Sequence, residues 1–434
     1  MARIAAQHRS TKLVFLLLVV SASGVWAEVP HVAIGILSGQ KSVVVASPQP
    51  LRIRESPQGK VLAEAPPGSV WRLSVSEGEK KAAVALFDGE GRAVAVAPSV
   101  SVVAAADAVV RLWSDVELKG KGRGRAYRGA LLVRVRGRTL QVVNVLPLED
   151  YLLGVVPSEM SPGSPPEALK AQAIAARSKA LASLSKHKTD GFNLCATEHC
   201  QTYGGADKEA PSTTQAVRDT RGVVLTYKGK IVDAVYSATC GGMTANSEDV
   251  WLKHPVPYLR SVPDGGLAQI LNALFPVPLA QMDWFFKAPV DACCKPVDGN
   301  ASHFRWTRGF SFADVERWAN AQQKIGKLVG VTVLERAVNG RVKRLEIKGE
   351  DGALVLAGDG DIRRFFRSLP SSAFIVEVLH DASGKPTGLK LWGAGWGHGV
   401  GMCQEGAVHR ARSGWTAEAI LKHYLTDVET QTIF

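Results

Sequence analysis

Glu159 stands in the segment VVPSEMSP, residues 155–162, between an apolar run and a turn marked by proline. We interpret the apolar run as the end of a buried strand. Burial at such a place raises the pKa of a carboxyl group, which suits a general acid that works near neutral pH. The alternative is a glutamate on the surface or at the start of a helix, because perturbed carboxylates also serve structure.

Two cysteines and a histidine lie within six residues of each other in CATEHC, namely Cys195, His199 and Cys200. Thiolates and imidazoles bind Zn²⁺, and His187 is a candidate fourth ligand. A disulfide between Cys195 and Cys200 is the competing interpretation. The two exclude each other, since zinc needs both sulfurs reduced and deprotonated. We favour zinc, because it gives His199 a chemical role.

Two glycine-rich segments carry further polar and aromatic groups. The first, residues 236–251, offers Ser237, Asn246 and Trp251 as groups that could hold a sugar; a tight turn with a core tryptophan is the plainer alternative. The second, residues 392–407, alternates glycine from 393 to 401 and contains His398. Its spacing does not fit a dinucleotide-binding loop. Alternate glycines let the backbone pass close to a ligand or another segment, and His398 is either a site residue or a packed structural histidine.

A long helix is expected to position these groups. Two prolines and Glu167 introduce an alanine-rich stretch, residues 167–187, whose Lys170 and Arg177 share one face. A solvated basic stripe is the ordinary explanation for that pair. Strands are expected at residues 222–227, 231–237, 331–335, 342–347 and 374–379, and helices at 405–413 and 416–425. This mixture predicts an α+β fold.

Length and alternation divide the 434 residues into parts. Residues 28–139 contain short alternating runs and predict a β-rich N-terminal accessory lobe. Residues 140–434 form the predicted catalytic domain, with an insertion at about 265–307.

Residues 1–27 predict a secretory signal peptide, with a basic start, a short apolar run and small residues before a cleavage site. We therefore expect an exported protein of the periplasm, wall or medium, with no transmembrane segment in its mature form. The formal charge of +12 falls to +9 without the leader. Such an excess favours a polyanionic partner, and export argues for wall polymers rather than nucleic acid.

Taken in order, several motifs resemble the SpoIID/LytB family, which contains sporulation stage II protein D and amidase enhancers. They are LPLEDYLLGVVPSEM, PPEALKAQAIAARSKA, HCQTYGG, GGMTANSEDVW with PYLRSV, IRRFFRSLPSSAF and GWGHGVGMCQEGA. The resemblance runs from Leu140 to near the C-terminus. It implies a lytic transglycosylase that acts on peptide-free glycan, with Glu159 as the catalytic acid.

The resemblance also implies roles for other residues. The basic helix positions fall on Lys170 and Arg177, and the family's serine and tyrosine fall on Ser237 and Tyr258. Some members bind zinc near the HC motif, so a structural zinc is expected at most, and no cofactor is required. Cys240 and Cys403 stand where serine is common, which suggests a redox-sensitive link between two loops.

One carboxyl group is enough for the implied reaction. Glu159 would protonate the glycosidic oxygen and then accept the proton of the C6 hydroxyl of N-acetylmuramic acid, which closes a 1,6-anhydro ring. Lys170 and Arg177 would pair with exposed lactyl carboxylates. Peptidoglycan glycan strands are the predicted partner, and a cell-wall amidase is a candidate. The alternatives are a non-catalytic wall-binding or amidase-activating module and, less well supported by the motifs, a zinc amidase.

Overall fold

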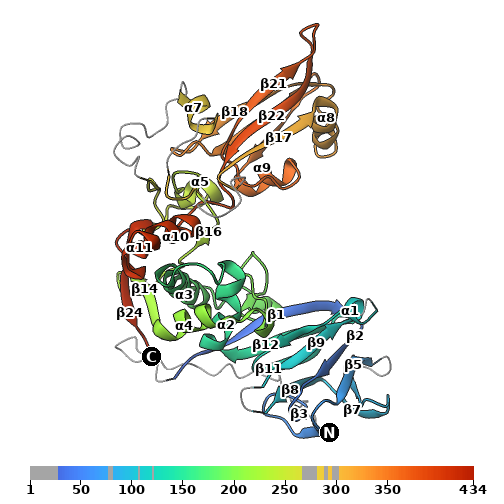
Figure 1. Cartoon of the computed structure of the whole chain (residues 1–434). Helices are drawn as coiled ribbons and strands as arrows, with labels where there is room; N and C mark the ends of the chain where they lie inside the picture. Colours follow the sequence, from blue (N-terminus) through green and yellow to red (C-terminus); the bar gives the residue numbers. More distant parts are fainter. Residues whose placement is uncertain are drawn as a thin grey trace, which may run out of the picture.

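Helices and mostly antiparallel sheets are mixed along the chain, which confirms the expected α+β class. The computed structural model describes residues 28–76, 82–105, 108–119, 122–265, 281–287, 292–295 and 303–434. The predicted signal peptide and much of the predicted insertion lie outside these ranges. Figure 1 shows a β lobe at the N-terminal end (blue), a helical middle, and a second β lobe (orange). Within the described residues, no helix is long and apolar enough to cross a membrane.

Two sheets form the N-terminal lobe. Alternation places one face of each strand in the core, as Val43 and Val45 show on β2. The first sheet has the order β13-β1-β12-β11-β8-β3-β4. Its strands are β1 (His31–Gln40), β3 (Leu51–Arg54), β4 (Val61–Ala65), β8 (Ser99–Ala104), β11 (Ala130–Arg136), β12 (Thr139–Pro147) and β13 (Leu194–Cys195). The second sheet has the order β10-β9-β2-β5-β6-β7. Its elements are β2 (Ser42–Ala46), β5 (Val70–Ser76), β6 (Ala83–Phe87), β7 (Ala93–Ala97), β9 (Val110–Ser114) and β10 (Arg125–Tyr127), with α1 (Asp115–Lys119) after β9.

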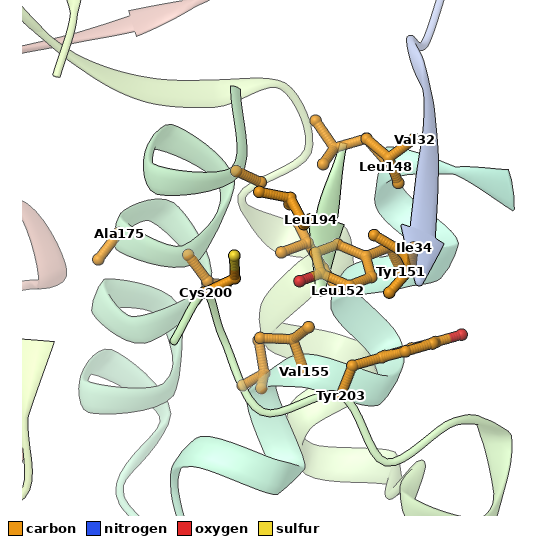
Figure 2. Packing of buried hydrophobic residues seen from close by; sticks show 14 of the residues in the cluster. Val32, Ile34, Leu148, Tyr151, Leu152, Val155, Ala175, Leu194, Cys200 and Tyr203 are labelled. Atoms are coloured by element: carbon orange, nitrogen blue, oxygen red, sulfur yellow. The ribbon is translucent and has the colours of Figure 1, made fainter. Parts of the chain in front are cut away.

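The N-terminal lobe and the helical middle share one hydrophobic core. Strand β12 lies between β1 and β11 and continues directly into α2 (Leu148–Glu159), so residues 140–147 are hydrogen-bonded within the first sheet. β13, which comes from the helical part, adds in parallel to the other side of β1. Figure 2 shows this junction, where Ile34 of β1, Leu152 of α2 and Tyr203 pack together.

The helical middle surrounds α3, the predicted long helix, which ends at Ala182 rather than near residue 187. The segment 155–159 is the last part of α2 and not the end of a strand, so that interpretation was wrong. Pro157 lies in the last turn of α2, and the backbone is extended at the cap residue Met160. The elements of this part are α3 (Pro166–Ala182), α4 (Pro211–Asp219), β14 (Val223–Tyr227), β15 (Lys230–Ile231), β16 (Tyr236–Ser237), α5 (Ser247–Trp251), β23 (Met402–Cys403), α10 (Gln404–Arg412), α11 (Ala417–Tyr424) and β24 (Glu429–Thr432).

The second β lobe has a core of its own, in which Leu345, Ile362 and Phe374 are fully buried. Three of its strands were expected, and β17, β20, β22 and the helices were not. Its elements are α7 (Met282–Lys287), β17 (Arg305–Ser311), α8 (Phe312–Asn320), β18 (Leu328–Arg336), β19 (Val342–Gly349), β20 (Ala353–Ala357), α9 (Asp359–Phe365), β21 (Phe374–His380) and β22 (Pro386–Ala394). After β22 the chain returns to the helical middle through β23.

Candidate active site

The side chain of Glu159 lies at the C-terminal end of α2 and is partly buried. Burial raises the pKa of Glu159, and hydrogen bonds from Thr202 and the charge of Lys179 oppose this rise. The backbone N–H of Thr202 donates to Oε1 of Glu159 at 2.5 Å. A carboxyl group held in one position with a raised pKa has the properties that a general acid needs.

A buried network fixes the segment that contacts Glu159. The hydroxyl of Tyr236 donates to Oε1 of Gln201 at 3.0 Å, and Nε2 of Gln201 donates to the hydroxyl of Tyr151 at 3.4 Å. All three side chains are buried. Since Thr202 follows Gln201, this network holds the N–H that faces the carboxyl group.

A second amide fixes the end of α2 itself. Nε2 of Gln404, at the start of α10, donates to the backbone oxygen of Glu159 at 2.9 Å and to Oε1 of Gln172 on α3 at 3.1 Å. The glycine-rich C-terminal motif therefore reaches the glutamate through Gln404.

The cation that acts on Glu159 is Lys179, which the sequence reasoning missed. Its positive charge lowers the pKa of both Glu159 and His398. Nζ of Lys179 also lies 3.0 Å from Oδ1 of Asp233. Helical periodicity could have identified Lys179. Residue 179 lies seven positions after Gln172, about two turns, and is therefore on the face of α3 that meets Gln404.

Arg177 does not provide a basic surface. Its side chain is fully buried, and Nε and Nη2 donate to the two carboxylate oxygens of Glu149 at 2.7 and 2.9 Å. Nη1 and Nη2 also reach backbone oxygens of Val223 and Val217 at 3.0 and 3.3 Å. The prediction that Arg177 pairs with glycan carboxylates was wrong, because its donors face the interior of the fold.

Lys170 lies on the same face of α3 as Arg177, about two turns nearer the start of the helix, and is partly exposed. Nζ pairs with Glu167 at 3.0 Å and with Asp219 of α4 at 3.5 Å. Its predicted contact with glycan carboxylates stays a prediction.

The glycine-rich loop, residues 392–401, carries His398 and contacts Ser237 through its backbone. The N–H of Gly399 donates to Oγ of Ser237 at 3.1 Å, and the N–H of Val400 donates to Nδ1 of His398 at 3.0 Å. Burial lowers the pKa of His398 to about 3, so the ring is neutral at neutral pH and its proton sits on Nε2. Gly399 has φ of 72°, and a Cβ there would lie 2.3 Å from the guanidinium of Arg341, so glycine is required at this position.

Two exposed tryptophans lie near His398. The rings of Trp251 and His398 have centroids 5.4 Å apart, and those of Trp396 and His303 are 4.2 Å apart. Trp251 and Trp396 are 40% and 38% exposed, which is high for such large apolar rings. Flat aromatic faces of this kind can stack on a sugar ring. The sequence reasoning named Trp251 and overlooked Trp396, although it stands in the same GWGHG motif as His398.

Asn246 and Tyr258 are partly exposed, and the polar groups of both hydrogen-bond within the fold. Oδ1 of Asn246 accepts from the N–H of Ser261 at 2.9 Å, and its Nδ2 donates to Asp249 at 3.0 Å. Asn246 therefore braces the loop before α5. The hydroxyl of Tyr258 accepts from the N–H of Asp233, the partner of Lys179, at 3.3 Å.

The first cysteine cluster consists of His187, Cys195, His199 and Cys200. Their ligand atoms lie within 4.8 Å of one another, and both cysteines are free thiols. Nδ1 of His187 contacts Oδ2 of Asp190 at 2.9 Å, which leaves Nε2 for a metal. A Cys₂His₂ set whose histidine is oriented by a carboxylate fits structural zinc.

Comparison with known proteins identifies relatives of this chain. Residues 136–227, which include Glu159, Lys179 and the first cysteine cluster, match the family described as Stage II sporulation protein (SpoIID), and residues 245–401 match a domain of unknown function, DUF8618. The chain is 32% identical to an uncharacterized protein of Brachyspira hyodysenteriae, over 70% of this chain and 72% of that protein. It is 28% identical to Stage II sporulation protein D of Bacillus subtilis, over 65% of this chain and 74% of that protein. It is 30% identical to the Amidase enhancer of Bacillus subtilis, over 63% of this chain and 39% of that protein. The chain belongs to the SpoIID family.

Proposed function

We propose that this protein is an exported cell-wall enzyme that cleaves peptidoglycan glycan strands as a lytic transglycosylase. The observation that carries the proposal is the state of the Glu159 carboxyl group. Burial raises its pKa, and the N–H of Thr202 holds it in one position. The names of the relatives, which refer to sporulation and to an amidase, support a role at the cell wall.

In the proposed reaction Glu159 acts twice. Its carboxylic acid donates a proton to the glycosidic oxygen as the bond from that oxygen to C1 of N-acetylmuramic acid breaks. The C6 hydroxyl of the same sugar then attacks C1, and the Glu159 carboxylate accepts the hydroxyl proton. The products are a free C4 hydroxyl on one strand and a 1,6-anhydro end on the other. No water is consumed, and the enzyme returns to its acid form.

Other side chains would hold the sugars. Neutral His398 has an Nε2–H that can donate to a sugar oxygen, and Trp251, which contacts His398, and Trp396 offer exposed apolar faces. Ser237 contributes indirectly, by fixing the backbone of Gly399. Lys179 is the cation that we propose in place of Arg177 to act near the reacting carboxyl group.

The first cysteine cluster is proposed to bind structural zinc. Cys200 lies two residues before Thr202 and is buried beside α2 and α3, as Figure 2 shows. Ligation there would brace the segment that contacts Glu159. All four candidate positions around the ion would come from the protein, so the metal would have no role in bond cleavage.

Digestion of peptide-stripped glycan in ¹⁸O-labelled water tests the reaction type. The proposal predicts 1,6-anhydro products without label, because an intramolecular hydroxyl replaces water. Labelled reducing ends would show a hydrolase instead. Binding without any product would favour the second candidate, an amidase-activating or wall-binding module, which the Amidase enhancer relative supports.

A further inference from the structure

Four buried side chains from distant parts of the sequence meet at Cys403, where the chain leaves the glycine-rich loop. They are Cys240, Asp264, Cys294 and Cys403, here called the second cysteine cluster. Their ligand atoms all lie within 4.8 Å of one another, and the three cysteines are free thiols. Cys240 is 4% exposed and the other three are completely buried. The proposed glycan chemistry uses none of them.

We propose that the second cysteine cluster is a structural zinc site with three thiolate ligands and one carboxylate ligand. Zinc prefers tetrahedral sites built from such ligands, with Zn–S bonds of about 2.3 Å and Zn–O bonds of about 2.0 Å. Those bond lengths place two sulfurs about 3.8 Å apart and a sulfur and an oxygen about 3.5 Å apart. Sγ of Cys240 lies 3.3 Å from Oδ2 of Asp264, so the observed spacing needs little adjustment.

The groups around the cluster suit a bound ion. The N–H of Cys240 donates to Sγ of Cys403 at 3.3 Å, as backbone amides do toward metal thiolates. The hydroxyl of Tyr424 donates to Oδ1 of Asp264 at 2.9 Å and orients that carboxylate. Gly406 leaves room for it, since a Cβ at this position would lie 2.4 Å from Oδ2 of Asp264.

Charge balance gives a separate argument for the same site. Three thiolates and a carboxylate carry four negative charges, and Zn²⁺ cancels two of them. Arg410 lies 3.1 Å from Oδ1 of Asp264, and the positive charge of Arg305 acts on Cys294 and Cys240. These two guanidinium groups neutralise the remaining two charges, as a buried site requires.

Sulfur–sulfur bonding is the competing chemistry. Three sulfurs can form only one disulfide among themselves, which leaves a thiol, a buried carboxylate and two arginines around it. Zinc uses all four side chains at once. It would also fasten Asp264, which directly precedes the predicted insertion, and Cys294, which lies within it, to Cys403 at the start of α10 and to Cys240 after β16.

Zinc content per chain tests the proposal on the full-length protein prepared from an oxidising compartment. With both cysteine clusters loaded, the wild type should hold two zinc ions per chain and show six thiols when denatured with chelator and no reductant. Cys294→Ser and Asp264→Asn should each lose one ion and lower the melting temperature. Cys293→Ser is the matched control, because the neighbouring Cys293 is outside the cluster, and it should keep both ions.

Variants of the first cluster keep the two sites distinguishable. The double variant Cys195→Ser/Cys200→Ser should keep one zinc ion, which would be held by the second cluster even if Cys294→Ser does not fold. A double variant without zinc would overturn the proposal. So would a disulfide mapped between any two of Cys240, Cys294 and Cys403 in the wild type.

Discussion

The backbone N–H of Thr202 donates a 2.5 Å hydrogen bond to the carboxyl group of Glu159, and Thr202 lies two residues after Cys200 of the first cysteine cluster. The contact joins a candidate metal site to the candidate catalytic acid through one short piece of backbone. A change in the cluster should therefore alter how the carboxyl group is held.

Loss of the first cluster should reduce turnover more than binding. Cys200→Ser removes one ligand, and we expect it to lose one zinc ion and to lower kcat because Thr202 is no longer held against Glu159. Measurement of zinc content and kcat on peptide-stripped glycan checks this, with Cys293→Ser as the control outside both clusters. Full kcat in a zinc-free Cys200→Ser protein would show that the metal does not influence the active site.

Lys179 should set the pH dependence of the reaction. A cation lowers the pKa of a nearby carboxyl group, so Lys179→Met should raise the pKa of Glu159 and move the basic limb of the pH–rate profile to higher pH. Lys170→Met, on another face of the same helix, should leave the limb in place. If both variants shift it equally, Lys179 has no special relation to Glu159.

Arg177 should affect stability and not substrate choice. Arg177→Met leaves Glu149 buried without its partner, which we expect to cost about 3–5 kcal/mol of unfolding free energy. The double variant Glu149→Leu/Arg177→Met should recover part of this loss, because no unpaired charge remains. Chemical denaturation of the three proteins checks the prediction. A stable Arg177→Met protein with weaker binding to peptide-free glycan would show that Arg177 takes part in substrate binding.

His398 should contribute to loss of stability in acid. Its pKa is about 3 in the folded protein and about 6.5 when unfolded, so below pH 6.5 the unfolded state binds the proton first. The stabilisation is complete above pH 6.5 and is lost as the pH falls toward 3. His398→Asn cannot titrate, and its melting temperature should fall less steeply over this interval. Equal slopes for variant and wild type would show that His398 is open to solvent in the folded protein.

Local patterns in the sequence predicted the elements better than the contacts between them. The prolines before Glu167 predicted the start of α3, and alternating valines predicted β2. The end of α2 was read as a strand because two β-branched residues and Pro157 disfavour a helix, yet its apolar face packs against the shared core.

Local sequence patterns did not predict contacts between residues that are far apart in the sequence. Spacing placed Lys170 and Arg177 on one helix face, but only the folded chain shows that Glu149 and α4 cover Arg177. The motifs predicted that Cys240 and Cys403 lie close together. They did not predict that Asp264 and Cys294 join them, because both stand in loops without a periodic pattern.

Product analysis of Glu159→Gln on peptide-stripped glycan tests the central claim most directly. Glutamine keeps the size of the side chain and an oxygen that can accept from Thr202, but it cannot donate and recover a proton, so turnover should fall by about 10²- to 10⁴-fold while glycan binding changes little. Glu198→Gln is the matched control, since Glu198 is an exposed acid whose charge acts on Glu159, and it should keep its activity. Mass spectrometry should find 1,6-anhydro products from the wild type and Glu198→Gln and almost none from Glu159→Gln. Undiminished 1,6-anhydro product from Glu159→Gln would contradict the account.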